Sequence, residues 1–100
     1  IFRSRKHCRV KGNSMLPTLN EGDLLIYKPF IYKEDYLHEG LIVVVKHPQE
    51  KGQLIVKRIS KVKPSSIEIL GDNIEFSFDS RHLGAIKQIN IEGIVESVIS

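Results

Sequence analysis

Apolar residues along the chain fall into short runs rich in β-branched side chains, and turn-forming residues separate these runs. The runs cover residues 23–28, 41–47, 53–62, 66–70 and 89–99, with Pro, Gly and Asn concentrated between them. No segment keeps an apolar period near 3.6 residues over about three turns, as an amphipathic helix would. The pattern therefore predicts a mainly β fold, built from coiled antiparallel sheets or a partly open barrel.

A few short elements complete this prediction. The segment HPQEKG at residues 47–52 has the composition of a hairpin loop between two of the strands. One or two helical turns are predicted at Met15–Leu19, where Pro17 suits a first helical turn, and at Lys33–Leu37.

Length and cysteine content limit the architecture further. One hundred residues suffice for a single domain with one modest core, so any function must reside on one small scaffold. The single cysteine, Cys8, allows no internal disulfide. The longest aliphatic run, Leu41–Val45, is far shorter than the roughly 20 residues that a membrane span needs. A disulfide scaffold and a transmembrane segment are therefore both excluded for these residues.

The positive charge of the chain is concentrated at its start. All charged side chains in residues 1–11 are basic, whereas the remaining residues carry more acids than bases. We therefore divide the chain into a basic N-terminal arm, residues 1–11, and a folded domain, residues 12–100. The arm is typical of a solvated leader strand, or of a segment that touches phosphates or an anionic membrane surface.

The first candidate for chemistry is Ser14, within the segment GNSMLPTL at residues 12–19. It lies between turn-forming residues and a Pro-stiffened turn, which can hold a hydroxyl at a strand end beside backbone N–H groups. A nucleophile with an oxyanion hole requires this arrangement. The alternative is a serine that only caps the turn before Pro17.

The second candidate is Lys57, within QLIVKRISKV. On a strand its side chain shares a face with Ile55 and Ile59, and apolar neighbours lower the pKa of a lysine from its ordinary value of about 10.4. A general base needs a pKa near 7 to 8, which costs roughly 4 kcal/mol, and a small domain rarely carries such a cost without a use. The alternative is a lysine whose ammonium reaches solvent at the strand end.

The third candidate is the segment GDNIEFSFDSR, residues 71–81. It supplies a hydroxyl (Ser77), a carboxylate (Asp79) and a guanidinium (Arg81), which share one face if the segment is a strand. Alone, these residues indicate no more than an ion pair in a turn. Together with Ser14 and Lys57 they fit a Ser/Lys variant of the catalytic triad.

Taken together, three segments resemble the boxes of type I signal peptidases, in the same order: Gly12–Asp23, Ile55–Ile59 and Gly71–Arg81. The short length, the VVVKHP segment at Val43–Pro48 and the direct run from Lys57 to Gly71 most resemble the branch that matures nickel-type superoxide dismutase. The resemblance implies the fold of signal peptidases and self-cleaving repressors, and a serine endopeptidase that removes an N-terminal leader from a precursor protein.

The resemblance also implies a role for each matching residue. Ser14 matches the nucleophile, Lys57 the general base, and Ser77 the hydroxyl that orients the lysine amine. Asp79 matches an acid that pairs with both Arg81 and Arg58, and Met15 and Pro17 match walls of the substrate cleft. At Gly12 some relatives have a serine that completes the oxyanion hole, so here only backbone donors are expected.

Several alternatives and partners follow from the same residues. One alternative substrate class is secretory precursors, as for a general signal peptidase; another function class is a non-catalytic β domain that binds nucleic acid or membrane through the basic arm. The self-cleaving repressors cut an Ala-Gly or Cys-Gly bond, but Ala85 and Cys8 are not followed by glycine, so cleavage in trans is expected.

No cofactor, metal or nucleic-acid partner is expected for the peptidase. The four histidines and Cys8 show no ligand spacing, so any nickel would belong to the substrate. The expected location is the cytoplasm of a prokaryote, or a membrane if an anchor precedes Ile1.

Overall fold

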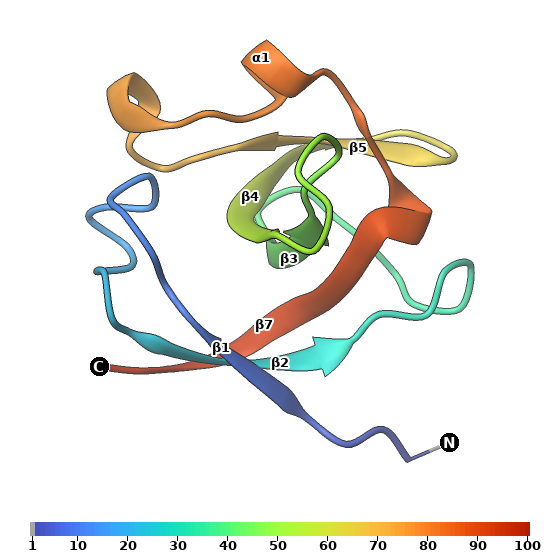
Figure 1. The fold of residues 1–100 in the computed structure, drawn as a ribbon. Helices are drawn as coiled ribbons and strands as arrows, with labels where there is room; N and C mark the ends of the chain where they lie inside the picture. Colours follow the sequence, from blue (N-terminus) through green and yellow to red (C-terminus); the bar gives the residue numbers. More distant parts are fainter. Residues whose placement is uncertain (1) are drawn as a thin grey trace.

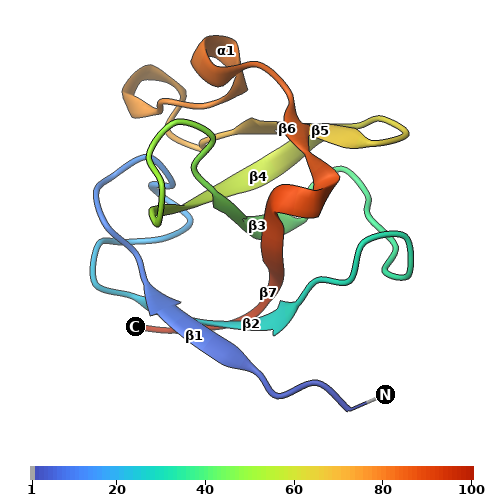
Figure 2. The ribbon, with the colours of Figure 1, turned by 45° about the vertical axis from the view of Figure 1, so that its right-hand side comes forward.

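A seven-stranded antiparallel sheet curls on itself to form a half-barrel in the computed structural model, which describes residues 2–100 (Figures 1 and 2). The strands are β1 (Lys6–Arg9), β2 (Leu24–Pro29), β3 (Ile42–Lys46), β4 (Leu54–Val62), β5 (Ser66–Leu70), β6 (Ile86–Lys87) and β7 (Ile91–Ile99). Three short helical turns accompany them: η1 (Ile74–Phe76), α1 (Ser80–Leu83) and η2 (Gln88–Asn90). The prediction of a mainly β, partly open barrel is confirmed.

The strand order in the sheet is β1-β2-β7-β3-β4-β5-β6. Strand β7, the last in the chain, therefore lies between β2 and β3 and pairs with both (Figure 1). The register shifts at three points, one each in the β2–β7, β3–β7 and β4–β5 ladders. Such irregularities increase the local twist of a sheet, which favours a curled sheet over a flat one.

The five predicted strands match β2, β3, β4, β5 and β7 to within about two residues at each end. The predicted hairpin loop joins β3 to β4, and the His47 N–H closes it by donating to the Gln53 carbonyl at 2.8 Å. Strands β1 and β6 were not predicted as separate strands. Their segments are short, and β1 lacks an apolar alternation.

One of the two predicted helical turns is confirmed, and the other is displaced. At Met15–Leu19 the chain forms a single turn, which the Leu19 N–H closes by donating to the Met15 carbonyl. The second turn lies at 31–35 instead of Lys33–Leu37, because Lys33 adopts a φ of 70°, which a right-handed helix does not allow. The α1 turn was not predicted; it forms after Asp79, whose side chain accepts a hydrogen bond from the Arg81 N–H and caps the helix.

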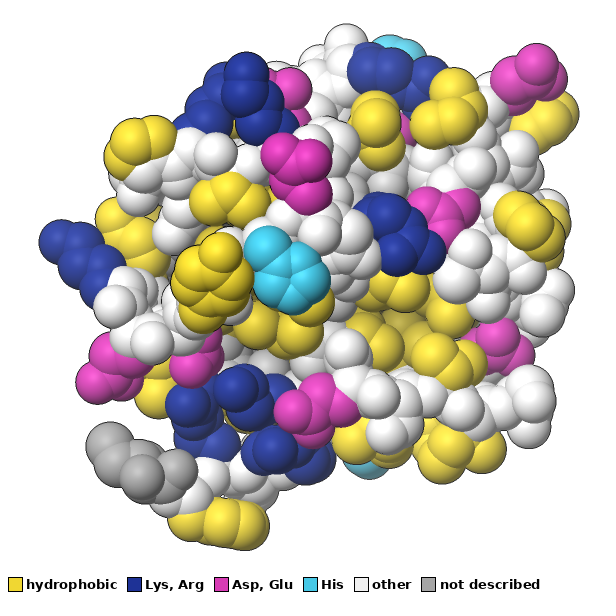
Figure 3. Space-filling model, turned by 180° about the vertical axis from the view of Figure 1, so that it is seen from behind, with side chains coloured by type: hydrophobic (Ala, Val, Ile, Leu, Met, Phe, Trp, Pro, Cys, Tyr) yellow, Lys and Arg dark blue, Asp and Glu magenta, His cyan; other side chains and the backbone are white. Residues whose placement is uncertain are grey.

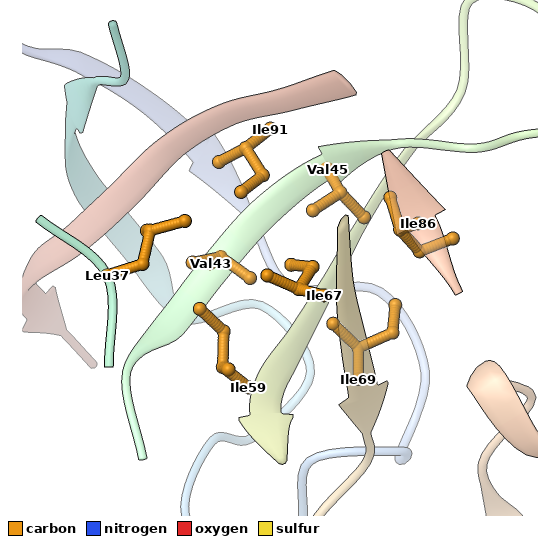
Figure 4. Close-up of a cluster of buried hydrophobic side chains, with 8 residues drawn as sticks. All are labelled: Leu37, Val43, Val45, Ile59, Ile67, Ile69, Ile86 and Ile91. Atoms are coloured by element: carbon orange, nitrogen blue, oxygen red, sulfur yellow. The ribbon is translucent and has the colours of Figure 1, made fainter. Parts of the chain in front are cut away.

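Two clusters of buried side chains stabilise the half-barrel. The larger one combines residues from β3 to β7 with one loop residue (Figure 4): Leu37, Val43, Val45, Ile59, Ile67, Ile69, Ile86 and Ile91. The smaller one consists of Val10, Met15, Leu19 and Leu25, with Val56 of β4 packed against it. Strand β4 thus contributes to both clusters, because its successive side chains point to opposite faces of the sheet.

The basic N-terminal segment is part of the sheet. Strand β1 pairs with β2, and three basic side chains contact carboxylates: Arg3 with Asp35, Arg5 with Glu96 and Lys6 with Glu92. Figure 3 shows Lys and Arg side chains gathered near the N-terminal end of the chain, with Asp and Glu side chains beside them. These ion pairs reduce the charge that the segment offers to an anionic partner.

Candidate active site

Ser14 and Lys57 meet although they are 43 residues apart in the sequence: Lys57 Nζ lies 2.7 Å from Ser14 Oγ. Ser14 is half-buried in the loop between β1 and β2, and Lys57 extends from the middle of β4. The hydroxyl therefore faces an amine and does not serve as a turn cap. This distance allows a hydrogen bond, and thus direct proton transfer between the two groups.

The Lys57 amine lies in apolar surroundings that lower its pKa. Its cross-strand neighbour is Val43, and Ile55 and Ile59 lie on the same face of β4 as Lys57. All three belong to the larger cluster or pack against it. Only 5% of Lys57 is exposed, so its side chain does not extend into solvent from the strand end. Burial lowers the pKa of Lys57, and the negative charge of Asp79 opposes this shift. The predicted apolar environment of Lys57 is confirmed.

Buried anchors hold the Ser14 loop against the sheet. Met15 and Leu19 are each 1% exposed and belong to the smaller cluster, so the residue next to Ser14 is fixed by packing. The Leu19 N–H donates to the Met15 carbonyl at 2.9 Å and closes the turn. Pro17, expected to form a wall of the cleft, is exposed on this turn and lies outside the cleft lining.

The segment 71–73 forms a second support for the Ser14 loop. The Asn73 N–H donates to the Ser14 carbonyl at 2.9 Å, and Asn73 Nδ2 donates to the Asn13 carbonyl at 3.0 Å. A Cβ on Gly71 would lie 2.6 Å from the Ser14 carbonyl oxygen and would also overlap Ser77. Only glycine allows this approach. Asn73 belongs to the segment 71–81 that the sequence analysis included, but it received no role there, because only the fold brings this segment to the Ser14 loop.

Asp79 is the centre of a buried hydrogen-bond network. It is fully buried, and its carboxylate accepts from the Ser77 hydroxyl at 2.7 Å, from the Gly71 N–H at 2.9 Å and from Arg81 Nε at 2.9 Å. Burial alone would raise the pKa of Asp79, but the hydrogen bonds from Arg81, Ser77 and two backbone N–H groups hold it well below its usual range. Asp79 therefore stays ionised beside the Lys57 amine.

Two expectations for this network are wrong, and a third stays a prediction. Residues 77, 79 and 81 do not share a strand face, because Ser77 follows η1 and Asp79 caps α1. The Ser77 hydroxyl donates to Asp79, and its role in orienting the Lys57 amine stays a prediction. Arg58 does not pair with Asp79; its guanidinium forms two hydrogen bonds to Asp72, at 2.8 and 2.7 Å.

The Arg58–Asp72 pair links strand β4, which carries Lys57, to the Ser14 loop. Asp72 also accepts a hydrogen bond from the Thr18 hydroxyl at 2.5 Å, and Arg58 donates to the Gly40 carbonyl at 2.7 Å. The pair therefore connects β4, the segment after β5 and the Ser14 loop. Arg58 misses Asp79 because alternation along β4 turns it to the face opposite Lys57.

The backbone near Ser14 defines the available oxyanion donors. Gly12 has a φ of 75°, and its N–H donates to the Glu21 carboxylate at 3.1 Å. The Ser14 N–H has no acceptor among residues 2–100. The Ser14 N–H is therefore free to donate to a bound group, whereas the Gly12 N–H is already occupied.

A cleft of about 660 Å³ opens beside the Ser14–Lys57 pair. One wall consists of residues 8–11, at the end of β1, with Ser14 and Met15; the other consists of residues 51–57, from the β3–β4 loop into β4. The end of β1 and the β3–β4 loop lie on the same side of the molecule in Figure 2. Met15 lines this cleft as expected.

The structure shows neither a metal cluster nor a membrane-spanning helix in the part of the chain it describes. Across residues 2–100, no three His, Cys, Asp or Glu side chains come together to hold a metal ion. No helix in the same range is long and apolar enough to cross a membrane.

Comparison with known proteins places the chain in a family. The Peptidase S24-like family model matches residues 4–96. The chain is 31% identical over 107 aligned positions to Mitochondrial ATP-independent inner membrane protease subunit 1a of Arabidopsis thaliana, covering 84% of this chain and 64% of the relative. It therefore spans less than two thirds of that relative's length.

A bacterial relative extends this comparison. The chain is 25% identical over 138 aligned positions to Signal peptidase I V of Bacillus subtilis (strain 168), covering 87% of this chain and 81% of the relative. The aligned region is longer than this chain, so the relative carries insertions. The chain belongs to the Peptidase S24-like family, as a distant homologue of signal peptidase I and of a mitochondrial inner membrane protease subunit.

Proposed function

We propose that this chain is a serine endopeptidase whose Ser14–Lys57 dyad removes an N-terminal leader from a precursor protein. The observation that carries the proposal is the 2.7 Å distance between Ser14 Oγ and the buried Lys57 Nζ. A lysine with a lowered pKa is uncharged more often at neutral pH, and only the uncharged amine accepts a proton. Membership of the Peptidase S24-like family supports the same chemistry.

The dyad supports a two-step acyl transfer. Lys57 Nζ accepts the Ser14 proton while Ser14 Oγ bonds to the scissile carbonyl carbon, and the Ser14 N–H stabilises the resulting oxyanion. When the tetrahedral intermediate collapses, the scissile C–N bond breaks and the leaving amine takes the proton from Lys57. Water then attacks the acyl ester, gives a proton to Lys57 and releases the leader as a carboxylic acid. That proton returns to Ser14 Oγ.

The cleft suggests how the precursor binds. Strand β1 is at the edge of the sheet, and residues 8–11 line the cleft. An extended peptide can add to such an edge through backbone hydrogen bonds, so that its scissile carbonyl lies near Ser14. Met15 closes the cleft near the nucleophile, which favours small side chains at that point of the substrate.

The precursor of nickel-type superoxide dismutase is the substrate that we propose, with secretory precursors as the second candidate. The first rests on the sequence resemblance, and the similarity to Signal peptidase I V of Bacillus subtilis favours the second. The non-catalytic binding module receives less support, because three basic residues of the N-terminal segment already contact carboxylates.

A direct test mixes the purified chain with each precursor and identifies new N-termini by mass spectrometry. Ser14→Ala should fold and cut neither precursor, and Ser97→Ala, an exposed serine on β7, should cut like the parent. Cleavage of one precursor alone assigns the substrate. Cleavage by Ser14→Ala near the parental rate would show that another group is the nucleophile.

A further inference from the structure

The charged side chains that line the active-site cleft are all basic. Besides Lys57 they are Arg9 and Lys11 on one wall and Lys51 on the other. No Asp or Glu belongs to the lining. Both walls therefore present positive charge to whatever occupies the cleft.

Arg9, Lys11 and Lys51 differ from the other basic residues of the N-terminal segment in their contacts. Arg3, Arg5 and Lys6 contact carboxylates, whereas no carboxylate in the described part of the chain forms a salt bridge with Arg9, Lys11 or Lys51. The Arg9 guanidinium donates only to the Gly22 carbonyl, at 2.9 Å, which leaves its charge unbalanced.

Two carboxylates lie near the basic residues of the cleft in the sequence, but they do not reduce the positive charge of the cleft lining. Glu21 accepts a hydrogen bond from the Gly12 N–H, and Glu50 precedes Lys51 on the hairpin loop. Neither lines the cleft. Charges of one sign on the walls of a concave site raise the local concentration of oppositely charged ligands.

We infer that the cleft selects precursors with acidic side chains within about six residues of the scissile bond; this rests on the proposed function. The distance follows from the walls: Lys51 precedes Lys57 by six residues, and Lys11 and Arg9 precede Ser14 by three and five. Strand β4 begins at Leu54 and Lys51 lies on the β3–β4 loop, so six fully extended residues, at about 3.3 Å each, are the longest reach that a substrate needs from the dyad to Lys51.

A peptide fits this cleft better than a nucleic acid, which basic side chains also attract. Proteins that bind single-stranded nucleic acids stack the bases on aromatic side chains. The cleft has no Phe, Tyr or Trp in its lining, and its apolar surface comes from aliphatic residues such as Val10, Ile55 and Val56. Such a surface accommodates the backbone and small side chains of a peptide.

The test uses paired substrates that differ by charge alone. Peptides that span the cleavage site of the precursor carry Glu or Gln at each position up to six residues from the scissile bond, and kcat/KM is measured at low and high salt. At one or more positions the Glu peptide should be cut roughly three- to tenfold more efficiently than the Gln peptide. The preference should disappear in about 1 M salt, where the Debye length falls to about 3 Å.

Charge reversal identifies the responsible side chain. Lys51→Glu should reverse the preference at the affected position, so that the Gln peptide becomes the better substrate. Lys87→Glu changes an exposed lysine on β6, outside the cleft, and should preserve the parental preference. Equal cleavage of both peptides by the parent and by Lys51→Glu would overturn the inference and leave the peptidase function intact.

Binding separates this inference from the proposed function. If no peptide is cut, the proposed peptidase function fails. Fluorescence anisotropy with the Ser14→Ala variant then still decides the charge preference, since it needs no cleavage. Tighter binding of the Glu peptide supports the inference, and equal binding refutes it. Displacement of the Glu peptide by a single-stranded oligonucleotide at lower concentration than by unlabelled peptide would also refute it, in favour of a nucleic-acid site.

Discussion

Replacing Lys57 by methionine should abolish cleavage and raise the stability of the domain. Methionine keeps a straight side chain of similar length but removes the amine. Lys57 is only 5% exposed, and its burial disfavours the charged amine. Replacing buried ion pairs by apolar groups of similar shape is neutral or stabilising by about 1–4 kcal/mol, and we expect the same range for this buried amine. The lost hydrogen bond to Ser14 offsets about 1 kcal/mol of this gain.

The expected net gain is about 0–3 kcal/mol at pH 7, and each kcal/mol raises Tm by roughly 4–8 °C in a domain of this size. The gain must also depend on pH. Burial lowers the pKa of Lys57 in the folded state, so between that pKa and 10.5 the unfolded chain binds more protons than the folded one. The stability of the parent therefore rises with pH through this window, by at most about 1.4 kcal/mol per pH unit. The advantage of Lys57→Met should shrink accordingly.

Thermal unfolding followed by circular dichroism from pH 6 to 10 measures this difference for the two proteins. Lys46→Met, at an exposed position on β3, is the matched control and should give a small difference without this pH dependence. A Lys57→Met variant less stable than the parent at pH 7, or a difference that is equal at pH 7 and pH 10, would refute our account of the buried amine.

Further predictions concern the supports of the dyad. Asp79→Asn should lower the free energy of unfolding by about 1–3 kcal/mol in urea, because it leaves a partly exposed guanidinium without its carboxylate. In the same variant, the rise of kcat/KM with pH should shift to lower pH, since the charge of Asp79 raises the pKa of Lys57; an unshifted profile would contradict this. The parent should lose stability as the pH falls below about 4, because the pKa of Asp79 is lowered on folding, and thermal melts at pH 2 to 6 test this. Gly71→Ala should cost about 1–3 kcal/mol and reduce kcat, because its Cβ would displace the Ser14 loop; a fully active, stable variant would show that the loop adapts.

Sequence reasoning succeeded where the relevant physics is local. Strand alternation alone placed Lys57 among isoleucines, and the structure buries the residue for that reason. Runs of β-branched residues between turn signals predicted five of the strands. These features depend on residues close together in the chain, so the sequence displays them directly.

The expectations that failed depend on contacts between distant segments. Strand β1 is polar and short, and it becomes a strand because β2 supplies its hydrogen bonds. Arg58 was expected to pair with Asp79, but it pairs with Asp72, because only the fold brings the Asp72 carboxylate beside it. Asp79 was expected on a strand face but caps a helical turn, because its side chain accepts the Arg81 N–H. No pattern in the sequence distinguishes these outcomes.

The dyad geometry results from packing on both sides of one strand. In β4, Val56 packs against the smaller cluster and Lys57 faces the larger one, so both faces of the strand are held at the position of Lys57. Ser14 is fixed in the same way, since Met15 next to it is buried in the smaller cluster and the Asn73 N–H donates to the Ser14 carbonyl. A small domain can thus bury an amine and still hold it 2.7 Å from its partner, because the side chains that desolvate Lys57 also immobilise the strand that carries it.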